Sequence, residues 1–253
     1  MGFTREAITT DKFLGGQLVL MQPRRGYRAG VDPVFLAAAV NAHEGESVLD
    51  LGCGVGAAAL SLGKRVPGLR LVGVELQKDY ADLCRLNAFE NNLEMEVYTA
   101  DLTDLPAELR EENFDHVIMN PPYHLRLSGT PAPDAGREKA VGEDTPLADW
   151  IDVATRRLKP RGHLTMIQKA DRLPEILEAM DDRLGSILVK PLCPREGRSA
   201  VLVLVQARKG GRGAFRLAAP LILHDGSEHV GDAESYRQEV SAILREGVAL
   251  PLW

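Results

Sequence analysis

The chain has 253 residues, 45% hydrophobic and 26% charged, a balance that is ordinary for a soluble globular protein and fits one α/β domain with additions. No apolar run approaches the roughly 18 residues that a membrane helix needs, and the N-terminus has no apolar signal region, so we expect a cytoplasmic protein without a membrane partner. The net charge of −6 gives a nucleic-acid partner no support, and three widely spaced cysteines predict neither disulfides nor a metal site.

The first part of the chain predicts a hairpin and then a helix. Short apolar runs at residues 18–22 and 27–29 flank residues 23–26, whose sequence PRRG is typical of a turn. Asp32 and Pro33 then precede an apolar run, and Asp at the N-cap with Pro at the first helical position is a strong helix start. The simplest interpretation of Asp32 is therefore a helix cap.

A nucleotide-binding arrangement follows. The apolar run at residues 47–51 predicts a strand, which leads through the loop GCGVG at residues 52–56 into a helix from about residue 57 to 66. Glycines allow a ligand to approach the backbone closely, and the start of a helix offers free N–H groups. This order of strand, glycine loop and helix therefore predicts a nucleotide site.

The spacing within this loop narrows the kind of nucleotide. Gly52, Gly54 and Ala57 satisfy the dinucleotide fingerprint, which is weak evidence by itself. Asp50 precedes the first glycine by two residues, and a third glycine, Gly56, comes early. A carboxylate so close to the loop would repel a pyrophosphate, and it suits a ligand with a cationic end, such as the α-amino group of a methionine moiety.

Two more acidic residues end predicted strands. Glu75 follows the strand at residues 71–74, where a carboxylate can accept hydrogen bonds from both hydroxyls of a ribose; the alternative is a cap for the helix at residues 77–91. Asp101 follows the strand at residues 95–100, where it can accept from an adenine amino group or cap the next turn. Glu75 thus indicates a nucleoside, in NAD or in S-adenosylmethionine alike.

The most informative stretch is the tetrapeptide of Asn120, Pro121, Pro122 and Tyr123, which follows the buried strand FDHVIM at residues 114–119. The prolines stiffen the backbone and keep it extended. The Asn120 side-chain oxygen and the Pro121 carbonyl both accept hydrogen bonds, and Tyr123 offers a ring face. These groups could hold a planar amino group by its two hydrogens. The alternative is a plain exit from a strand into a turn.

A segment rich in Gly, Pro and charge, residues 124–145, comes next, and segments of this length are usually mobile or functional. It contains Arg126, Arg137 and Lys139. Helices and strands alternate again after it, and we expect the last two long strands to pair antiparallel. The remaining predicted elements are helices at 147–158, 172–184 and 233–246 and strands at 163–168, 186–190, 200–207 and 221–223.

This alternation predicts an α/β fold with a doubly wound, Rossmann-like sheet that is mostly parallel and has an antiparallel strand near the C-terminus. Ligands of such sheets bind at the carboxyl ends of the strands. Asp50, Glu75, Asp101 and Asn120 all stand at such ends, and four motifs converging on one edge are stronger evidence than any one of them. We expect a single domain over residues 1–253, with an N-terminal hairpin extension at 1–31, a catalytic core at 32–209 and a C-terminal strand and helix extension at 210–253.

The four motifs together resemble those of the class I S-adenosylmethionine-dependent methyltransferases. Residues 50–56 resemble their first motif, Glu75 their ribose-binding acid and Asp101 their adenine-binding acid. Asn120 to Tyr123 is similar to the NPPY catalytic motif of the branch that methylates planar amide or exocyclic amino nitrogens. The resemblance covers residues 13–208 and implies S-adenosylmethionine as the cofactor. The cofactor-binding residues that it implies are Asp50, Gly52, Gly54, Gly56, Glu75, Asp101, Leu102 and Asn120.

Within that branch the chain is most similar to the bacterial methyltransferases that modify N6 of an anticodon-loop adenine in a valine tRNA. The likeness lies in residues 26–32, the NPPY motif and residues 198–210. Val31 departs from the pattern, where a small hydroxyl residue is more usual, and so does His124, where an aromatic residue is expected. The resemblance implies that Asn120 and Pro121 accept both N6 hydrogens, that Tyr123 stacks on a flipped-out base, and that no metal takes part.

A tRNA partner requires phosphate contacts. We expect Arg28, Arg126, Arg137 and Arg198 to bind the substrate. Basic residues near the entry and within residues 190–216 could form a basic face, or they could be ordinary solvated surface. They are Arg24, Arg25, Lys190, Arg195, Arg208, Lys209, Arg212 and Arg216.

Other functions stay open on the sequence alone. The same clamp fits the side-chain amide of a glutamine in a release factor, although such enzymes usually carry a separate N-terminal helical domain, and the short stretch before the first motif disfavours it. Ribosomal RNA guanine and DNA adenine are further acceptors. A different class is an NAD-dependent oxidoreductase, which would leave Asp50 and the tetrapeptide unexplained. The sequence predicts no oligomeric state.

Overall fold

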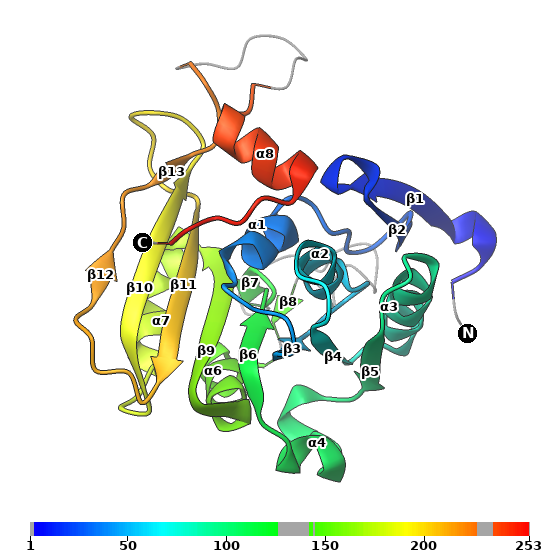
Figure 1. Ribbon diagram of the computed structural model, residues 1–253, viewed down its shortest axis with the longest axis horizontal. Coiled ribbons are helices and arrows are strands. Elements are labelled where there is room, and N and C mark those ends of the chain that lie inside the picture. Colours follow the sequence, from blue (N-terminus) through cyan, green and yellow to red (C-terminus); the bar gives the residue numbers. More distant parts are fainter. Residues whose placement is uncertain (1–2, 126–141, 144, 227–234, 253) are drawn as a thin grey trace.

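A nine-stranded mixed sheet runs through the centre of the molecule in the computed structural model, which describes residues 3–125, 142–143, 145–226 and 235–252 (Figure 1). The five strands of this sheet that come first in the chain run parallel, and β11 (Leu202–Lys209) is antiparallel to both of its neighbours. The predicted α/β class, with a mostly parallel sheet and an antiparallel strand near the C-terminus, is confirmed. The order is β5 (Met95–Thr99), β4 (Arg70–Glu75), β3 (Ser47–Leu51), β6 (Phe114–Met119), β9 (Leu158–Lys169), β11 (Leu202–Lys209) and β10 (Leu184–Cys193), with β12 (Arg216–Leu217) and β13 (Leu221–Ile222) both beside β10.

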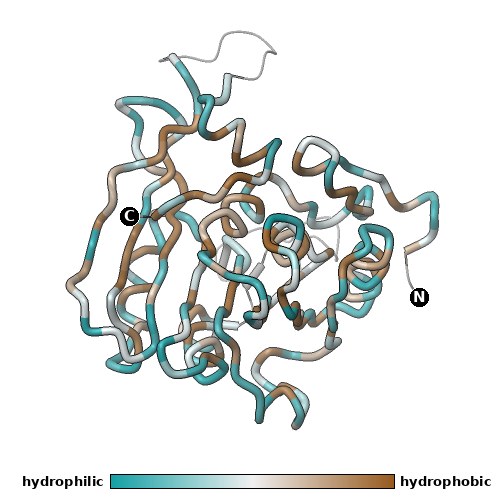
Figure 2. The backbone as a smooth tube through the Cα atoms, viewed as in Figure 1, coloured by the Kyte–Doolittle hydropathy of each residue, from teal (hydrophilic) through white to brown (hydrophobic). Residues whose placement is uncertain are grey.

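Helices cover both faces of this sheet, which is why its strands read as nearly continuous apolar runs. Successive residues of a strand enter different apolar layers, as Val48 and Leu49 of β3 do. Figure 2 shows the hydrophobic residues concentrated along the central strands, with hydrophilic residues in the outer loops. One layer lies under α1 (Asp32–Ala39), α2 (Ala57–Arg65), α3 (Lys78–Glu90) and α8 (Gln238–Glu246), and the other under α4 (Ala107–Glu111), α6 (Leu147–Arg157) and α7 (Leu173–Ala179).

The strand order places a switch point in the middle of the sheet. From β3 the chain first adds β4 and β5 on one side, and then crosses to add β6 and β9 on the other side. Ligands of open α/β sheets bind at such a switch, beyond the carboxyl ends of the strands. The residues that follow β3, β4 and β6 therefore surround one space.

The N-terminal hairpin differs from the one expected. Strand β1 (Ile8–Phe13) pairs antiparallel with β2 (Leu18–Pro23), and the turn lies between them, where Gly15 and Gly16 take positive φ angles of 63° and 97°. The expected strand at residues 27–29 is wrong, because these residues form no ladder. Positive φ favours glycine, so the Gly15–Gly16 pair was the turn signal that the sequence offered.

Helix α3 and its C-cap bind the backbone of β2 through Asn87 and Asn91, which lie one turn apart. The Asn87 side chain accepts from the Met21 N–H at 2.7 Å and donates to the Met21 carbonyl at 3.1 Å. The Asn91 side chain makes the same pair of bonds with Val19, at 2.9 and 2.7 Å. Both asparagines are buried, so these bonds replace the water that β2 would otherwise need.

Candidate active site

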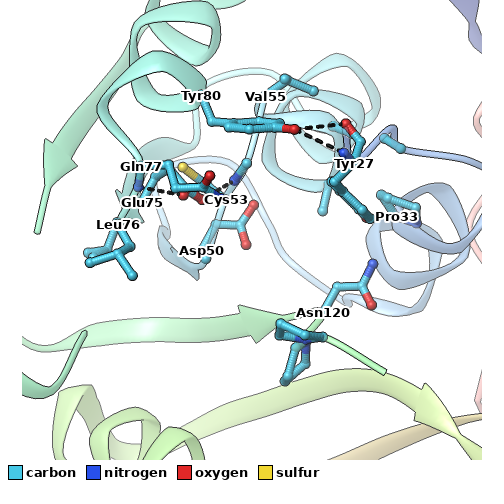
Figure 3. A pocket seen from close by; sticks show the side chains of 18 of the residues that line it. Tyr27, Pro33, Asp50, Cys53, Val55, Glu75, Leu76, Gln77, Tyr80 and Asn120 are labelled. Carbon is cyan, nitrogen blue, oxygen red and sulfur yellow. Dashed lines mark hydrogen bonds between the residues drawn. The ribbon is translucent and has the colours of Figure 1, made fainter. Parts of the chain in front are cut away.

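A cavity of about 270 Å³ opens at the carboxyl ends of β3, β4 and β6, as expected from the strand order. Figure 3 shows Asp50, Glu75 and Asn120 around it, with Tyr27 and Tyr80 from other segments. Gly56 lies outside the lining, at the N-cap of α2. The predicted site residues that line the cavity are Arg28, Asp50, Gly52, Gly54, Glu75, Asp101, Leu102, Asn120, Pro121, Pro122 and Tyr123.

The glycine loop forms a cradle in which a side chain at either of two positions would collide with a neighbouring residue. Gly52 and Gly56 take positive φ angles of 68° and 89°. A Cβ atom on Gly52 would lie 2.6 Å from Cη2 of Trp150, and one on Gly56 would lie 2.8 Å from Sγ of Cys84. Trp150 of α6 lines the cavity and supports the loop, but no sequence pattern had indicated it.

Asp50 is held behind this loop with little access to water. It is 3% exposed, and its Oδ2 accepts the Ala59 N–H near the start of α2 at 3.3 Å. Burial raises the pKa of Asp50 to about 8 and outweighs the hydrogen bond from Ala59, which lowers it, while the charge of Glu75 adds a smaller rise. A cationic group entering the cavity would stabilise the ionised form of Asp50.

Glu75 links the end of β4 to the glycine loop. Its Oε2 accepts the Gly54 N–H at 2.9 Å, and its Oε1 accepts the Gln77 N–H at 2.8 Å (Figure 3). Burial raises the pKa of Glu75 even though these backbone donors favour the charged form. Each carboxylate oxygen keeps a second lone pair, so Glu75 can still accept from two hydroxyl groups of a ligand.

Asp101 serves as the cap that the sequence left as an alternative. Its Oδ1 accepts from the N–H and the hydroxyl of Thr103, at 2.8 and 2.7 Å, at the start of the short helix Leu102–Asp104. Asp101 and the buried Leu102 also line the cavity. A ligand contact from Asp101 would therefore use its other carboxylate oxygen.

Asn120 presents an unpaired acceptor. Its Oδ1 is shielded from water and has no hydrogen-bond partner among the described residues. Buried acceptors rarely stay unpaired, and one that lines a cavity is an expected partner for a ligand donor. The carbonyl of Pro121 lies beside it and already accepts one hydrogen bond, from the Gln168 side chain at 3.2 Å.

Tyr123 is fixed by Asp32, which corrects the expected role of that aspartate. The Tyr123 hydroxyl donates to Oδ2 of Asp32 at 2.6 Å. Burial, reinforced by Asp32, raises the pKa of Tyr123 far above its ordinary value, so the hydroxyl keeps the proton that it donates. The N-cap of α1 is Val31, whose carbonyl accepts from Val34, so Asp32 does not cap the helix. Its side chain instead ties α1 to the NPPY motif.

Tyr27 and Tyr80 complete the wall opposite Asn120 (Figure 3). The Tyr80 hydroxyl accepts from the Tyr27 N–H at 3.0 Å and donates to the Tyr27 carbonyl at 3.2 Å. Burial raises the pKa of Tyr27, and the nearby Asp32 and Asp50 raise it further. Neither tyrosine was expected at the site, because the contact joins residues that lie far apart in the sequence.

The sequence matches the family model of the methyltransferase small domain over residues 30–189. The chain belongs to this family. It is therefore an S-adenosylmethionine-dependent methyltransferase, as the motifs implied, and the alternative of an NAD-dependent oxidoreductase is wrong. The glycine cradle, the buried acids and the free oxygen of Asn120 fit such a cofactor.

Relatives of this methyltransferase include a tRNA1(Val) (adenine(37)-N6)-methyltransferase of Porphyromonas gingivalis, 33% identical over 176 residues, or 66% of this chain and 68% of the relative. A protein of the same name from Dickeya chrysanthemi is 26% identical over 249 residues, 95% of each chain. Among solved structures, a predicted O-methyltransferase from Agrobacterium tumefaciens has a TM-score of 0.69 at 28% identity, covering 87% of this chain and 98% of its own. The T. thermophilus 16S rRNA N2 G1207 methyltransferase, in complex with AdoMet and guanosine, has a TM-score of 0.57 at 21% identity over 80% of this chain and 50% of its own, and supports the Rossmann-like fold.

The arginines expected to bind the methyltransferase's substrate fall into three groups. The Arg28 guanidinium donates to Thr9 Oγ1 at 2.6 Å, to the Pro23 carbonyl at 2.8 Å and to Asp11 at 2.6 Å, so its bonds fasten the hairpin. Arg198 is exposed in the loop between β10 and β11. Arg126 and Arg137 lie outside the described residues, as does most of the expected loop at 124–145, whose ends form the pair β7 (His124–Leu125) and β8 (Gly142–Glu143).

The basic residues within 190–216 do not gather at one edge of the methyltransferase sheet. Leu202 of β11 pairs with Lys169 at the carboxyl end of β9, whereas Arg208 pairs with His163 near the opposite edge. Arg195 and Arg198, before β11, are thus at the cavity edge, and Arg208 and the residues that follow it are at the other. Arg195 is buried and donates to carbonyls of the C-terminal segment. The length of β11 therefore separates the residues that could have formed one basic face.

Among the residues that the structure describes, no group of three or more His, Cys, Asp and Glu side chains could hold a metal ion. None of the helices that the structure describes is both long and apolar enough to cross a membrane.

Proposed function

We propose that this methyltransferase transfers a methyl group from S-adenosylmethionine to the exocyclic N6 of an adenine in a tRNA anticodon loop. The observation that carries the proposal is the unpaired, shielded Oδ1 of Asn120 at the cavity, next to the Pro121 carbonyl and the fixed ring of Tyr123. The names of the curated relatives support the choice of tRNA and of N6. The cofactor would be held by Asp50, Gly52, Gly54, Gly56, Glu75, Asp101 and Leu102, and Asn120 would stand between the cofactor and the acceptor, with its oxygen turned to the acceptor.

The chain's part in the reaction is to hold and orient the acceptor. The lone pair of an adenine N6 is delocalised into the ring, which makes the amine a poor nucleophile. Asn120 Oδ1 and the free lone pair of the Pro121 carbonyl would accept the two N6 hydrogens and localise the nitrogen lone pair. S-adenosylmethionine supplies an activated methyl group together with its own leaving group. Orientation of this kind can contribute about 7–11 kcal/mol.

Tyr123 would stack on the target base after it leaves its neighbours, and a single-stranded loop makes this extrusion inexpensive. The hydrogen bond to Asp32 keeps the ring in place before the base arrives. Arg198 at the cavity edge, with Arg126 and Arg137, would contact the RNA backbone. We also propose that residues 1–253 act as one domain, because the hairpin extension leads directly into Tyr27 and Arg28 of the cavity wall.

A release-factor glutamine is the second candidate acceptor, because its amide nitrogen also presents two hydrogens to the same clamp. The test is methyl transfer from labelled S-adenosylmethionine to unmodified tRNA in one reaction and to release factor protein in another. We expect label in tRNA, recovered as N6-methyladenosine. Label in protein alone would move the acceptor to glutamine.

Asn120→Ala is the control for this assay. We expect it to bind the cofactor within about twofold of the wild type and to lose about 100-fold or more in turnover, since it removes an interaction made with the reacting nitrogen. Unchanged turnover would remove Asn120 from the mechanism. A parallel loss of cofactor affinity would make it a cofactor ligand only.

A further inference from the structure

Gln168 lies beside the NPPY motif, at the point where the backbone pairing between β6 and β9 ends. Strands β6 and β9 pair up to Met119 and Met166, and the next residues of the β6 chain include two prolines. Proline has no N–H and cannot continue a ladder. Strand β9 continues past this point and carries Gln168, which is fully buried.

The side chain of Gln168 replaces the missing ladder. Its Nε2 donates to the Pro121 carbonyl at 3.2 Å and lies 3.4 Å from the Pro122 carbonyl. Its Oε1 accepts the Lys169 backbone N–H at 2.8 Å. That backbone donor faces the amide oxygen, so the NH₂ group is turned toward the motif. The orientation of the amide is thus set by the protein itself.

These bonds involve the carbonyl of Pro121, a residue that lines the cavity and is one of the two proposed acceptors for the reacting amino group. A carbonyl oxygen has two lone pairs, and Gln168 uses one of those on Pro121. The other remains for an incoming amino group, in a direction that the first bond helps to fix. We propose that Gln168 is a positioning residue for methyl transfer, which aims the free lone pair of the Pro121 carbonyl at the acceptor nitrogen. The proposal rests on the proposed function only in requiring an amino or amide acceptor.

The competing explanation is that Gln168 merely satisfies two buried carbonyls. The chain offers a matched control in Gln206, which is also buried and lies on the neighbouring strand β11. Its Nε2 donates to Thr165 Oγ1 at 3.3 Å, so this bond joins Gln206 to β9 and not to the NPPY motif. Gln168→Leu and Gln206→Leu therefore make the same chemical change in the same sheet, with and without a bond to the motif.

The experiment compares both variants with the wild type for cofactor affinity by calorimetry, for kcat and KM on the acceptor that the wild type labels, and for melting temperature. We expect Gln168→Leu to lower kcat by about 10–100-fold with cofactor affinity within about twofold, because small misplacements of reacting groups are costly. We expect Gln206→Leu to keep kcat within about twofold. Equal kcat in the two variants would overturn the proposal, and so would a loss in Gln168→Leu that falls entirely on cofactor affinity.

Gln168→Glu gives a second readout that a purely structural role would not produce. A protonated glutamate can donate to the Pro121 carbonyl, whereas a carboxylate cannot. We expect its activity relative to wild type to rise as the pH falls, and a ratio that stays low at every pH would contradict the proposal. A wild type that labels no tRNA refutes the proposed function separately, because the comparison of variants is made on whichever acceptor is labelled.

Discussion

Asp50 should gain a proton when the cofactor leaves and lose it when the cofactor binds. Burial raises its pKa to about 8, so at pH 7 about nine tenths of the free enzyme carries a protonated Asp50. If the cationic amino group of the cofactor binds Asp50, it favours the carboxylate and expels that proton. Cofactor affinity should therefore increase with pH, by up to tenfold for each unit, until about pH 8, and stay constant above that pH.

The same rise in pKa means that Asp50 lowers the stability of the folded protein at neutral pH. Its pKa in the folded protein lies above the unfolded value, so its contribution to stability is greatest at low pH and is lost as the pH rises from about 4 to about 8. At pH 7 this loss is about 4 kcal/mol, at about 1.4 kcal/mol for each unit between the unfolded pKa and pH 7. Asn cannot ionise, so Asp50→Asn should raise the free energy of unfolding by up to about 4 kcal/mol at pH 7 and by less than about 2 kcal/mol at pH 5.

Two measurements check this reasoning. Calorimetry of cofactor binding in buffers with different ionisation enthalpies counts the released protons, and we expect about 0.9 per site at pH 7 for the wild type and none from this position in Asp50→Asn. Denaturant unfolding at pH 5, 7 and 8 gives the stability difference, and other titrating groups largely cancel between the two proteins. Two results together would refute the argument: no proton release on cofactor binding, and a stability difference between wild type and Asp50→Asn that is the same at pH 5 and pH 8. They would show that Asp50 is already ionised in the free enzyme.

Three further changes test other contacts. Gly52→Ala places a methyl group against Trp150 at an unfavourable φ. We expect a loss of about 1–3 kcal/mol in unfolding free energy and weaker cofactor binding by calorimetry. Wild-type values for both would contradict the requirement for glycine at this position. Tyr123→Phe frees the ring from Asp32 and should lower kcat at unchanged cofactor affinity, with equal kcat as the opposing result. Arg28→Ala should lower the melting temperature and leave KM for tRNA unchanged, and a raised KM would restore Arg28 as a substrate contact.

The sequence predicted the parts of the site that follow directly from strand ends. Asp50, Glu75 and Asn120 were placed correctly because each stands at the carboxyl end of a parallel strand, and parallel ends share one edge of the sheet. The glycine loop was predicted because its spacing requires backbone freedom at fixed positions. Such inferences need only the local pattern and the rule for connecting parallel strands.

Contacts between distant segments could not be read in this way. The bonds of Tyr123 to Asp32 and of Pro121 to Gln168 join elements whose relative rotation depends on packing in both layers. The local pattern at Asp32 indicated a cap, and that interpretation was wrong. The basic residues before and after β11 lie at opposite ends of that strand, so their closeness in the sequence did not imply a single basic face.

Because Asn87 of α3 and Asn91 at its C-cap bind β2, the position of the cavity wall depends on the rotation of that helix about its axis. Successive helical residues are turned by about 100°, so one residue inserted between Tyr80 and Asn87 would swing both Asn87 and Asn91 away from β2. The hairpin would lose its partner, and with it the position of Tyr27, which Tyr80 holds from the same helix. Helix α3 should therefore accept substitutions on its outer face, but not changes of length over these residues. The same bonds occupy backbone groups on this edge of β2, so a strand from another chain cannot pair with them. Such pairing at exposed edge strands is a common route to aggregation.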